Sequence, residues 1–259
     1  MSGSASASRV PEESSRNAGR WGGSNGYLAQ SERPLTSLVF LLPLILAYEL
    51  GTLYFMDGSA EGHPQQIIAF VMMRRFFEVF GATVSYLPAL AVISVLIAWH
   101  VARRDAWTVR VDVLAGMVVE SAVLAVPVLV IGYVLSTYLP LAAGSAQTRE
   151  LVILSIGAGV YEELIFRLVL LNVLSLLLHN ALQLKGWWVG ALMVLTSGVL
   201  FSAYHRLGDS GALRVQPFLF RTMAGIYFAL LFLARGFGIT AASHGAYDVL
   251  IVVLTAGDS

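Results

Sequence analysis

The chain contains no cysteine among its 259 residues. Disulfide bonds, thiolate metal sites and a cysteine nucleophile are therefore excluded. Charged residues are also scarce, since Lys, Arg, Asp and Glu make up 12% of the chain, against about 25% in soluble domains. Basic and acidic residues balance to a net charge of zero, so nothing in the composition indicates a nucleic-acid partner.

Hydrophobic residues make up 57% of the chain, which is typical of an integral membrane protein. About 20 consecutive apolar residues span a bilayer core. On that criterion the sequence predicts an all-α, polytopic transmembrane helix bundle with about seven spans. The predicted spans are Leu35–Met56, Thr83–Val101, Val113–Leu139, Leu151–Leu178, Trp187–Tyr204, Pro217–Ala234 and Gly238–Leu254. Segment Pro64–Phe80 mixes charged and aromatic residues and is predicted to be an interfacial helix.

Residues 1–33 are rich in Ser, Gly, Ala and Arg and lack the apolar core of a signal peptide. We expect them to form a disordered polar tail, followed by a single membrane-embedded helical domain over residues 34–259. Lys and Arg are more frequent in the loops on the side of the N-terminus than in the others. This bias predicts a multi-pass protein of the cell inner (cytoplasmic) membrane with its N-terminus in the cytoplasm.

Three charged residues lie within six positions in the middle of the fourth predicted span: Glu162, Glu163 and Arg167. One ionisable group at the centre of a membrane helix costs roughly 2.5–3.5 kcal/mol, so such a cluster indicates a functional site. Glu163 and Arg167 are four residues apart and can form an ion pair. Glu162 points about 100° away from Glu163 on a helix, which leaves it free to face a cavity as a reactive carboxylate.

Two further blocks supply histidines. Phe201-Ser-Ala-Tyr-His205 ends the fifth predicted span, and His244-Gly-Ala-Tyr-Asp248 lies in the seventh. His244 and Asp248 share one face of a helix, because they are one turn apart. If these groups converge with Glu162 in a dry cavity, they can activate water and stabilise an oxyanion.

In order and kind, these three blocks resemble those of the CPBP family, the CAAX protease and bacteriocin-processing intramembrane proteases. The family is also called the abortive-infection or type II CAAX prenyl endopeptidase family. The resemblance extends over Leu151–Leu254. It implies an intramembrane endopeptidase, a hydrolase that cleaves a membrane-associated peptide or protein substrate in the lipid bilayer.

By motif position, the resemblance implies that Glu162 and His205 activate the attacking water. It implies that His244 and Asp248 stabilise the oxyanion, and that Glu163 and Arg167 support the site. Many members have asparagine where this chain has Asp248. Either Asp248 is protonated, or it orients His244, or the site is that of a metalloprotease. Zinc accepts the ligand set of Glu162, His205, His244 and Asp248, so a metal stays an alternative to the water activated by glutamate and histidine alone.

Helix rise gives a further expectation about depth. If the fifth and seventh spans run parallel, a rise of 1.5 Å per residue offsets His205 from His244 by roughly 18 Å. Two other functions also stay open on the residues alone. A proton-coupled transporter would use the same acids and histidines as a relay, but the sequence shows neither a charge ladder nor an inverted repeat. A non-catalytic membrane scaffold would retain the fold without the reaction.

Overall fold

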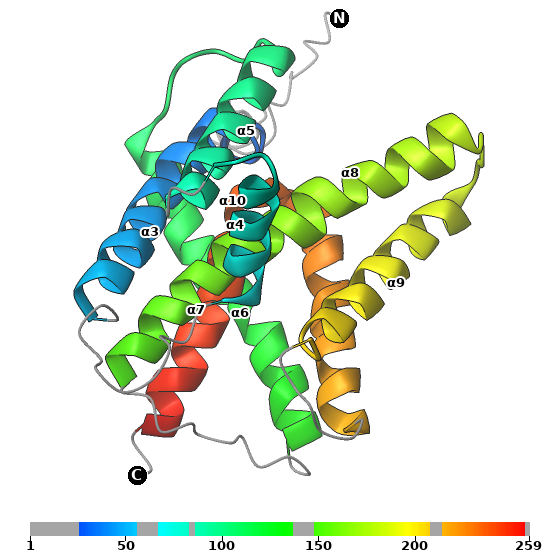
Figure 1. Ribbon diagram of the computed structural model, residues 1–259. Coiled ribbons are helices and arrows are strands. Elements are labelled where there is room, and N and C mark those ends of the chain that lie inside the picture. Colours follow the sequence, from blue (N-terminus) through cyan, green and yellow to red (C-terminus); the bar gives the residue numbers. More distant parts are fainter. Residues whose placement is uncertain (1–25, 56–66, 83–85, 137–147, 208–213, 257–259) are drawn as a thin grey trace, which may run out of the picture.

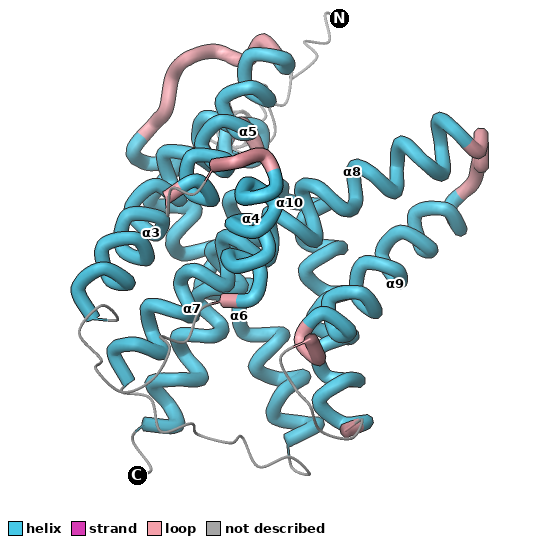
Figure 2. The backbone as a smooth tube through the Cα atoms, in the orientation of Figure 1, coloured by secondary structure: helices cyan, strands magenta, loops and turns pink. Residues whose placement is uncertain are grey.

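The computed structural model describes residues 26–55, 67–82, 86–136, 148–207 and 214–256. These residues form helices and no strand (Figure 1, Figure 2), which confirms the predicted all-α helix bundle. The elements are α2 (Tyr27–Ser31), α3 (Pro34–Phe55), α4 (Ile68–Val79), α5 (Leu87–Arg103), α6 (Val111–Ser136), α7 (Thr148–Glu163), η1 (Leu164–Val169), α8 (Leu170–Ser175), η2 (Leu176–Ala181), α9 (Trp187–Tyr204) and α10 (Val215–Ala256).

Five stretches of the described residues are long and apolar enough to cross a membrane. They are Pro34–Tyr54, Val111–Leu135, Thr148–Ala181, Trp187–Tyr204 and Val215–Thr255. The predicted span Thr83–Val101 corresponds to α5, which begins at Leu87. With 17 residues, α5 is shorter than each of these five stretches. The sixth and seventh predicted spans are both contained in α10. The chain is therefore an integral membrane protein, with several of its helices matching the predicted spans closely.

Helix α10 changes direction at Gly236, whose φ of 76° and ψ of −177° are non-helical. Only glycine adopts this conformation without strain. The break divides α10 into a first arm, residues 215–235, and a second arm, residues 237–256. In Figure 1 the first arm rises and the second arm descends towards the C-terminus. The two predicted spans thus exist as two arms, joined by a single residue instead of a loop.

Residues 26–33, which belong to the predicted polar tail, are among the described residues. Tyr27–Ser31 form the short helix α2, while residues 1–25 lie outside the described residues. Arg235, next to the break in α10, donates hydrogen bonds to Ser31, Glu32 and Glu120. These contacts tie α2 to α6 and α10, and the polar composition of the segment gave no sign of them.

Tyr27 completes this polar cluster by donating a hydrogen bond to Glu120. Burial and the nearby Glu120 carboxylate raise the pKa of the Tyr27 phenol above its ordinary value. The phenol therefore stays protonated and keeps its donor. Because Glu120 is engaged in this way, its role is structural, at the level where the two arms of α10 meet.

Helix α7 lies at the centre of the bundle, where it packs against α3 on one side and α10 on another. Its small residues permit this close approach, as at Gly159, where an added Cβ would lie 2.5 Å from the backbone nitrogen of Gly245. Helices α8 and α9 form a hairpin that projects to one side of the bundle (Figure 1). The arrangement brings the last turn of α9 and the second arm of α10 to the end of α7.

Candidate active site

Glu162, one residue from the end of α7, has a buried carboxylate that faces both motif histidines. Its Oε1 accepts a hydrogen bond of 3.3 Å from the Tyr204 hydroxyl. Its Oε2 lies 3.6 Å from His205 Nε2 and 4.0 Å from His244 Nε2. Among the described residues, Glu162 Oε2 has no hydrogen-bond partner. The carboxylate therefore keeps one oxygen available for a reacting group.

His205 caps the C-terminal end of α9. Its Nδ1 lies 2.9 Å from the backbone carbonyl oxygen of Phe201. Since a carbonyl can only accept, Nδ1 must carry the hydrogen. In the neutral ring this leaves Nε2 with a lone pair directed towards Glu162 Oε2. These two atoms are 3.6 Å apart, which is longer than a direct hydrogen bond. Both can instead accept hydrogen bonds from one small donor placed between them.

His244 is fixed on three sides. Its Nδ1 lies 2.7 Å from Glu163 Oε1, and its Nε2 lies 3.4 Å from Asp248 Oδ2 on the next turn. The ring of Phe228 stacks on the imidazole, with 4.7 Å between centroids and an interplanar angle of 20°. A histidine held through one nitrogen presents the other in a defined direction. Nε2 is thereby directed to the region between Glu162 and Asp248.

Glu163 and Arg167 form the predicted ion pair, with 3.0 Å between Glu163 Oε2 and Arg167 Nε and both side chains fully buried. Arg167 also donates a hydrogen bond to the carbonyl oxygen of Gly225 and lies over the ring of Phe201. Glu163 does more than neutralise Arg167, because its other oxygen holds His244. Residues of α7, α9 and both arms of α10 therefore meet at this pair.

A π-helical turn, η1, begins immediately after Glu163. A π-turn inserts an extra residue and releases backbone groups from the regular helix pattern, and such turns are frequent at functional sites. The carbonyl oxygen of Phe166 accepts a hydrogen bond from Ser197 Oγ of α9. This bond ties η1 to α9 and helps to fix the position of Glu162 relative to the end of α9.

Sequence reasoning did not identify Tyr204, Phe228 or Ser197 as part of the site. Tyr204 had a signal, since it directly precedes His205 in the second motif. The sequence carried no signal for Phe228 or Ser197. Phe228 contacts His244 between the two arms of α10, and Ser197 of α9 contacts Phe166 of η1. The expected depth offset between His205 and His244 was wrong, since both lie near Glu162. Helix α9 is inclined to the second arm of α10 (Figure 1), so residue counts along the two helices do not measure the same depth.

A cavity of about 400 Å³ gives access to the site. Glu162, Tyr204, His205 and Asp248 line one part of it. The other lining residues are apolar except for one serine, and they come from the beginning of α4 and from α7: Ile67, Ile68, Leu151, Leu154, Ser155 and Ala158. An apolar group can therefore be accommodated beside the carboxylate and the histidine.

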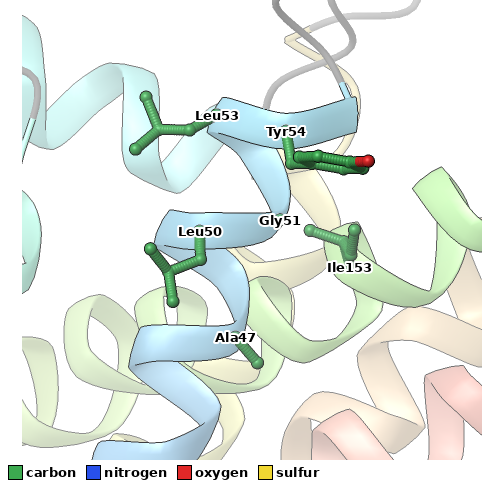
Figure 3. A pocket seen from close by; sticks show the side chains of 6 residues that line it. All are labelled: Ala47, Leu50, Gly51, Leu53, Tyr54 and Ile153. Atoms are coloured by element: carbon green, nitrogen blue, oxygen red, sulfur yellow. The ribbon is translucent and has the colours of Figure 1, made fainter.

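A second pocket lies between α3 and α7, with a volume of about 580 Å³. Figure 3 shows its lining: Ala47, Leu50, Gly51, Leu53, Tyr54 and Ile153. Apart from the Tyr54 phenol, these side chains are apolar and offer no acid or base. This pocket is therefore not a candidate for the reaction centre.

The structure also bears on the metal alternative. Among the described residues, no group of three or more His, Asp or Glu side chains is arranged so that it could hold a metal ion. Nδ1 of each histidine is engaged, by the Phe201 carbonyl in His205 and by Glu163 in His244. A metal-binding histidine is commonly held in this way, so Nε2 of both rings is the nitrogen that a metal would bind, and the metal form stays an alternative for experiment.

Comparison with known proteins agrees with the motifs. Residues 144–250 match the family described as Type II CAAX prenyl endopeptidase Rce1-like. This stretch is less than half of the chain, but it includes all three motifs. No curated protein and no solved structure matched the chain. The resemblance to the CPBP proteases is thus confirmed over residues 144–250, which are similar to the Rce1-like type II CAAX prenyl endopeptidase family.

Proposed function

We propose that this chain is an intramembrane endopeptidase in which Glu162 and His205 activate the attacking water. The observation that carries the proposal is the position of Glu162 Oε2. This oxygen is buried and has no hydrogen-bond partner among the described residues, and it faces the Nε2 atoms of two histidines. A carboxylate and an imidazole that share one water form the general base needed for peptide hydrolysis.

The first step is attack of water on the carbonyl carbon of the peptide bond. Water donates one hydrogen to Glu162 and the other to His205 Nε2, and loses a proton to this pair as the new C–O bond forms. The carbonyl oxygen becomes an oxyanion. His244 Nε2, which lies 4.0 Å from Glu162 Oε2, and the neighbouring Asp248 donate hydrogen bonds to the oxyanion when they are protonated.

The second step is collapse of the tetrahedral intermediate. The C–N bond breaks, and the leaving amine takes back the proton held by Glu162 and His205. The products are a carboxylic acid and an amine, and the site returns to its starting protonation state. Transfer of the acid proton to the amine then gives a carboxylate and an ammonium group. Glu163 and Arg167 take no proton in this scheme. Glu163 holds the His244 ring, and Arg167 balances the buried charge of Glu163. The position of His244 is therefore the same in both steps.

The apolar lining of the cavity supports a substrate with apolar side chains near the cleaved bond, as in a membrane-associated peptide or protein. The family name refers to prenylated CAAX sequences, so these are the first substrates to test. A proton-coupled transporter gains no support, since the matching family is one of proteases.

Cleavage by the purified, liposome-reconstituted chain tests the proposal. The probes are a fluorogenic peptide ending in a farnesylated CAAX sequence and its unmodified counterpart. Glu162→Gln and His205→Ala should each lower kcat by about 10²–10⁴-fold, the usual contribution of a general base. Glu150→Gln, which removes a carboxylate from the first turn of α7, is the matched control and should retain activity.

Two outcomes would change the proposal. Unchanged cleavage in both Glu162→Gln and His205→Ala would exclude the mechanism. Loss of wild-type activity on chelation, with recovery on addition of zinc, would favour the metal form, in which Glu162, His205, His244 and Asp248 are the residues available as ligands.

A further inference from the structure

Arg235 is the last residue of the first arm of α10, directly before the break at Gly236. Its Nε and Nη2 donate hydrogen bonds to the two carboxylate oxygens of Glu120 in α6. Nη1 donates to Glu32, and Nη2 donates also to Ser31 of α2. All three guanidinium nitrogens are thus engaged, and the pairing with Glu120 is bidentate, a geometry that is both strong and directional. We call these four side chains the Arg235 cluster.

The break itself does little to fix the angle between the two arms. Gly236 has no side chain, and its φ of 76° lies in a region that glycine adopts freely. Contacts from neighbouring helices must therefore hold the angle. A Cβ added to Gly236 would lie 3.7 Å from the Cα of Glu32, and one added to Gly238 would lie 2.8 Å from Ser37 Oγ. The start of the second arm is thus packed against the segment that Arg235 holds.

The angle between the arms is important because the proposed site is built across both of them. Phe228 of the first arm stacks on the ring of His244 in the second arm. Arg167 donates a hydrogen bond to the carbonyl oxygen of Gly225, also in the first arm. Its ion-pair partner Glu163 holds His244 in the second arm. Figure 1 shows the two arms diverging from the break, so a change of their angle would move His244 relative to Phe228 and Arg167.

A small rotation at the break is amplified at His244. This residue lies eight positions beyond Gly236, roughly 12 Å along the helix at a rise of 1.5 Å per residue. A rotation of about 10° at the break would then move the imidazole by roughly 2 Å. His244 Nε2 lies 4.0 Å from Glu162 Oε2, so such a shift is large on the scale of the site. A contact far from the site can therefore control the rate of the proposed reaction.

We propose that Arg235 is a positioning residue for the proposed reaction. Its cluster fixes the break in α10 against α2 and α6, and this holds the second arm at the angle that directs His244 towards Glu162. Arg235 does not line the cavity at Glu162 and acts only through the second arm. This inference rests on the proposed function, because its effect on the rate is measured by cleavage, whereas the angle between the arms is measured without cleavage.

The angle is tested in the full chain, reconstituted in liposomes. The chain has no native cysteine, so Leu219→Cys in the first arm and Val253→Cys in the second, both at exposed positions, place two spin labels uniquely. Pulsed electron paramagnetic resonance measures the distance between the labels. Arg235→Gln should shift or broaden the distance distribution. Arg110→Gln is the matched control, because it removes an arginine from an exposed ion pair with Asp112 of α6, and it should leave the distribution unchanged.

Cleavage of the farnesylated peptide is measured with the same two variants. Arg235→Gln should lower kcat by about 10- to 100-fold, the effect of a small misplacement of a catalytic group. KM should change little, because Asp248 is the only described residue of α10 that lines the cavity. Arg110→Gln should cleave as the wild type does.

A double variant separates position from charge balance. Arg235→Gln leaves the carboxylate of Glu120 without its cation, which lowers stability as well. Glu120→Gln/Arg235→Gln removes both charges, so its thermal midpoint should lie closer to that of the wild type. Its kcat should stay low and its distance distribution should stay altered, because one amide cannot replace the three donor nitrogens of the guanidinium group.

Three outcomes would overturn the proposal: an unchanged distance distribution in Arg235→Gln, an altered distribution with wild-type kcat, or recovery of wild-type kcat in the double variant. Absence of cleavage by the wild type would instead contradict the proposed function. The label distances would then still decide whether Arg235 sets the angle between the arms.

Discussion

Glu163 Oε1 lies 2.7 Å from His244 Nδ1, although the two residues are 81 positions apart. The second glutamate of the motif therefore joins a local ion pair to a distant histidine. One carboxylate holds Arg167 through one oxygen and His244 through the other. Its removal should affect both the stability of the bundle and the orientation of the imidazole.

Replacing Glu163 by Gln should destabilise the protein by about 3–5 kcal/mol, because Arg167 is left as an uncompensated buried charge. The measurement is denaturant-induced unfolding of the purified chain in detergent. The double variant Glu163→Gln/Arg167→Met should recover part of this loss, since it removes the unpaired cation. A single variant as stable as the wild type would show that the pair contributes nothing.

Replacing Tyr204 by Phe should lower kcat by about fivefold and leave KM unchanged. The hydroxyl donates a hydrogen bond to Glu162 Oε1, and because this bond is long, at 3.3 Å, it contributes on the order of 1 kcal/mol. Tyr161→Phe is the control, since that hydroxyl bonds to Glu49 instead. The role of Tyr204 as a positioning residue is contradicted if both variants reduce kcat equally.

Asp248→Asn should hydrolyse the substrate at least as fast as the wild type, whereas Asp248→Ala should be slower by about 10²-fold, as when one oxyanion donor is removed. The amide keeps the size of the side chain and always carries a donor. Initial rates with the farnesylated peptide provide the comparison. A loss in Asp248→Asn as large as that in Asp248→Ala would mean that the charge of Asp248 acts on His244, from which it lies 3.4 Å away.

Gly159→Ala should lower the thermal midpoint and the cleavage rate together. An added Cβ would lie 2.5 Å from Gly245 N and 2.6 Å from Ala241 O, so α7 and the second arm of α10 would have to separate. Such overpacking costs about 1–3 kcal/mol. Gly190→Ala in α9 is the matched control, because no atom lies within 4 Å of its added Cβ. That variant should be more stable by about 0.5–1 kcal/mol.

Features that depend on one helix alone were predicted well. The apolar runs located most of the helices, and Trp187–Tyr204 agrees with the structure at both ends. The Glu163–Arg167 pair follows from residues four apart on one helix. The separation of Glu162 from Glu163 follows from the rotation between successive residues. These properties need only the rise and twist of a helix, which are the same in any fold.

Tertiary structure decided which distant groups meet. The break at Gly236, the inclination of α9 and the packing of α7 against α10 bring His205 and His244 close to Glu162. The same packing pairs Glu163 with His244 and places Phe228 against its ring. Residue spacing does not encode the tilt of one helix relative to another, because tilt results from side-chain packing between helices. The sequence by itself therefore determined the helices and the three motifs, and only the folded bundle determined how those motifs form one site.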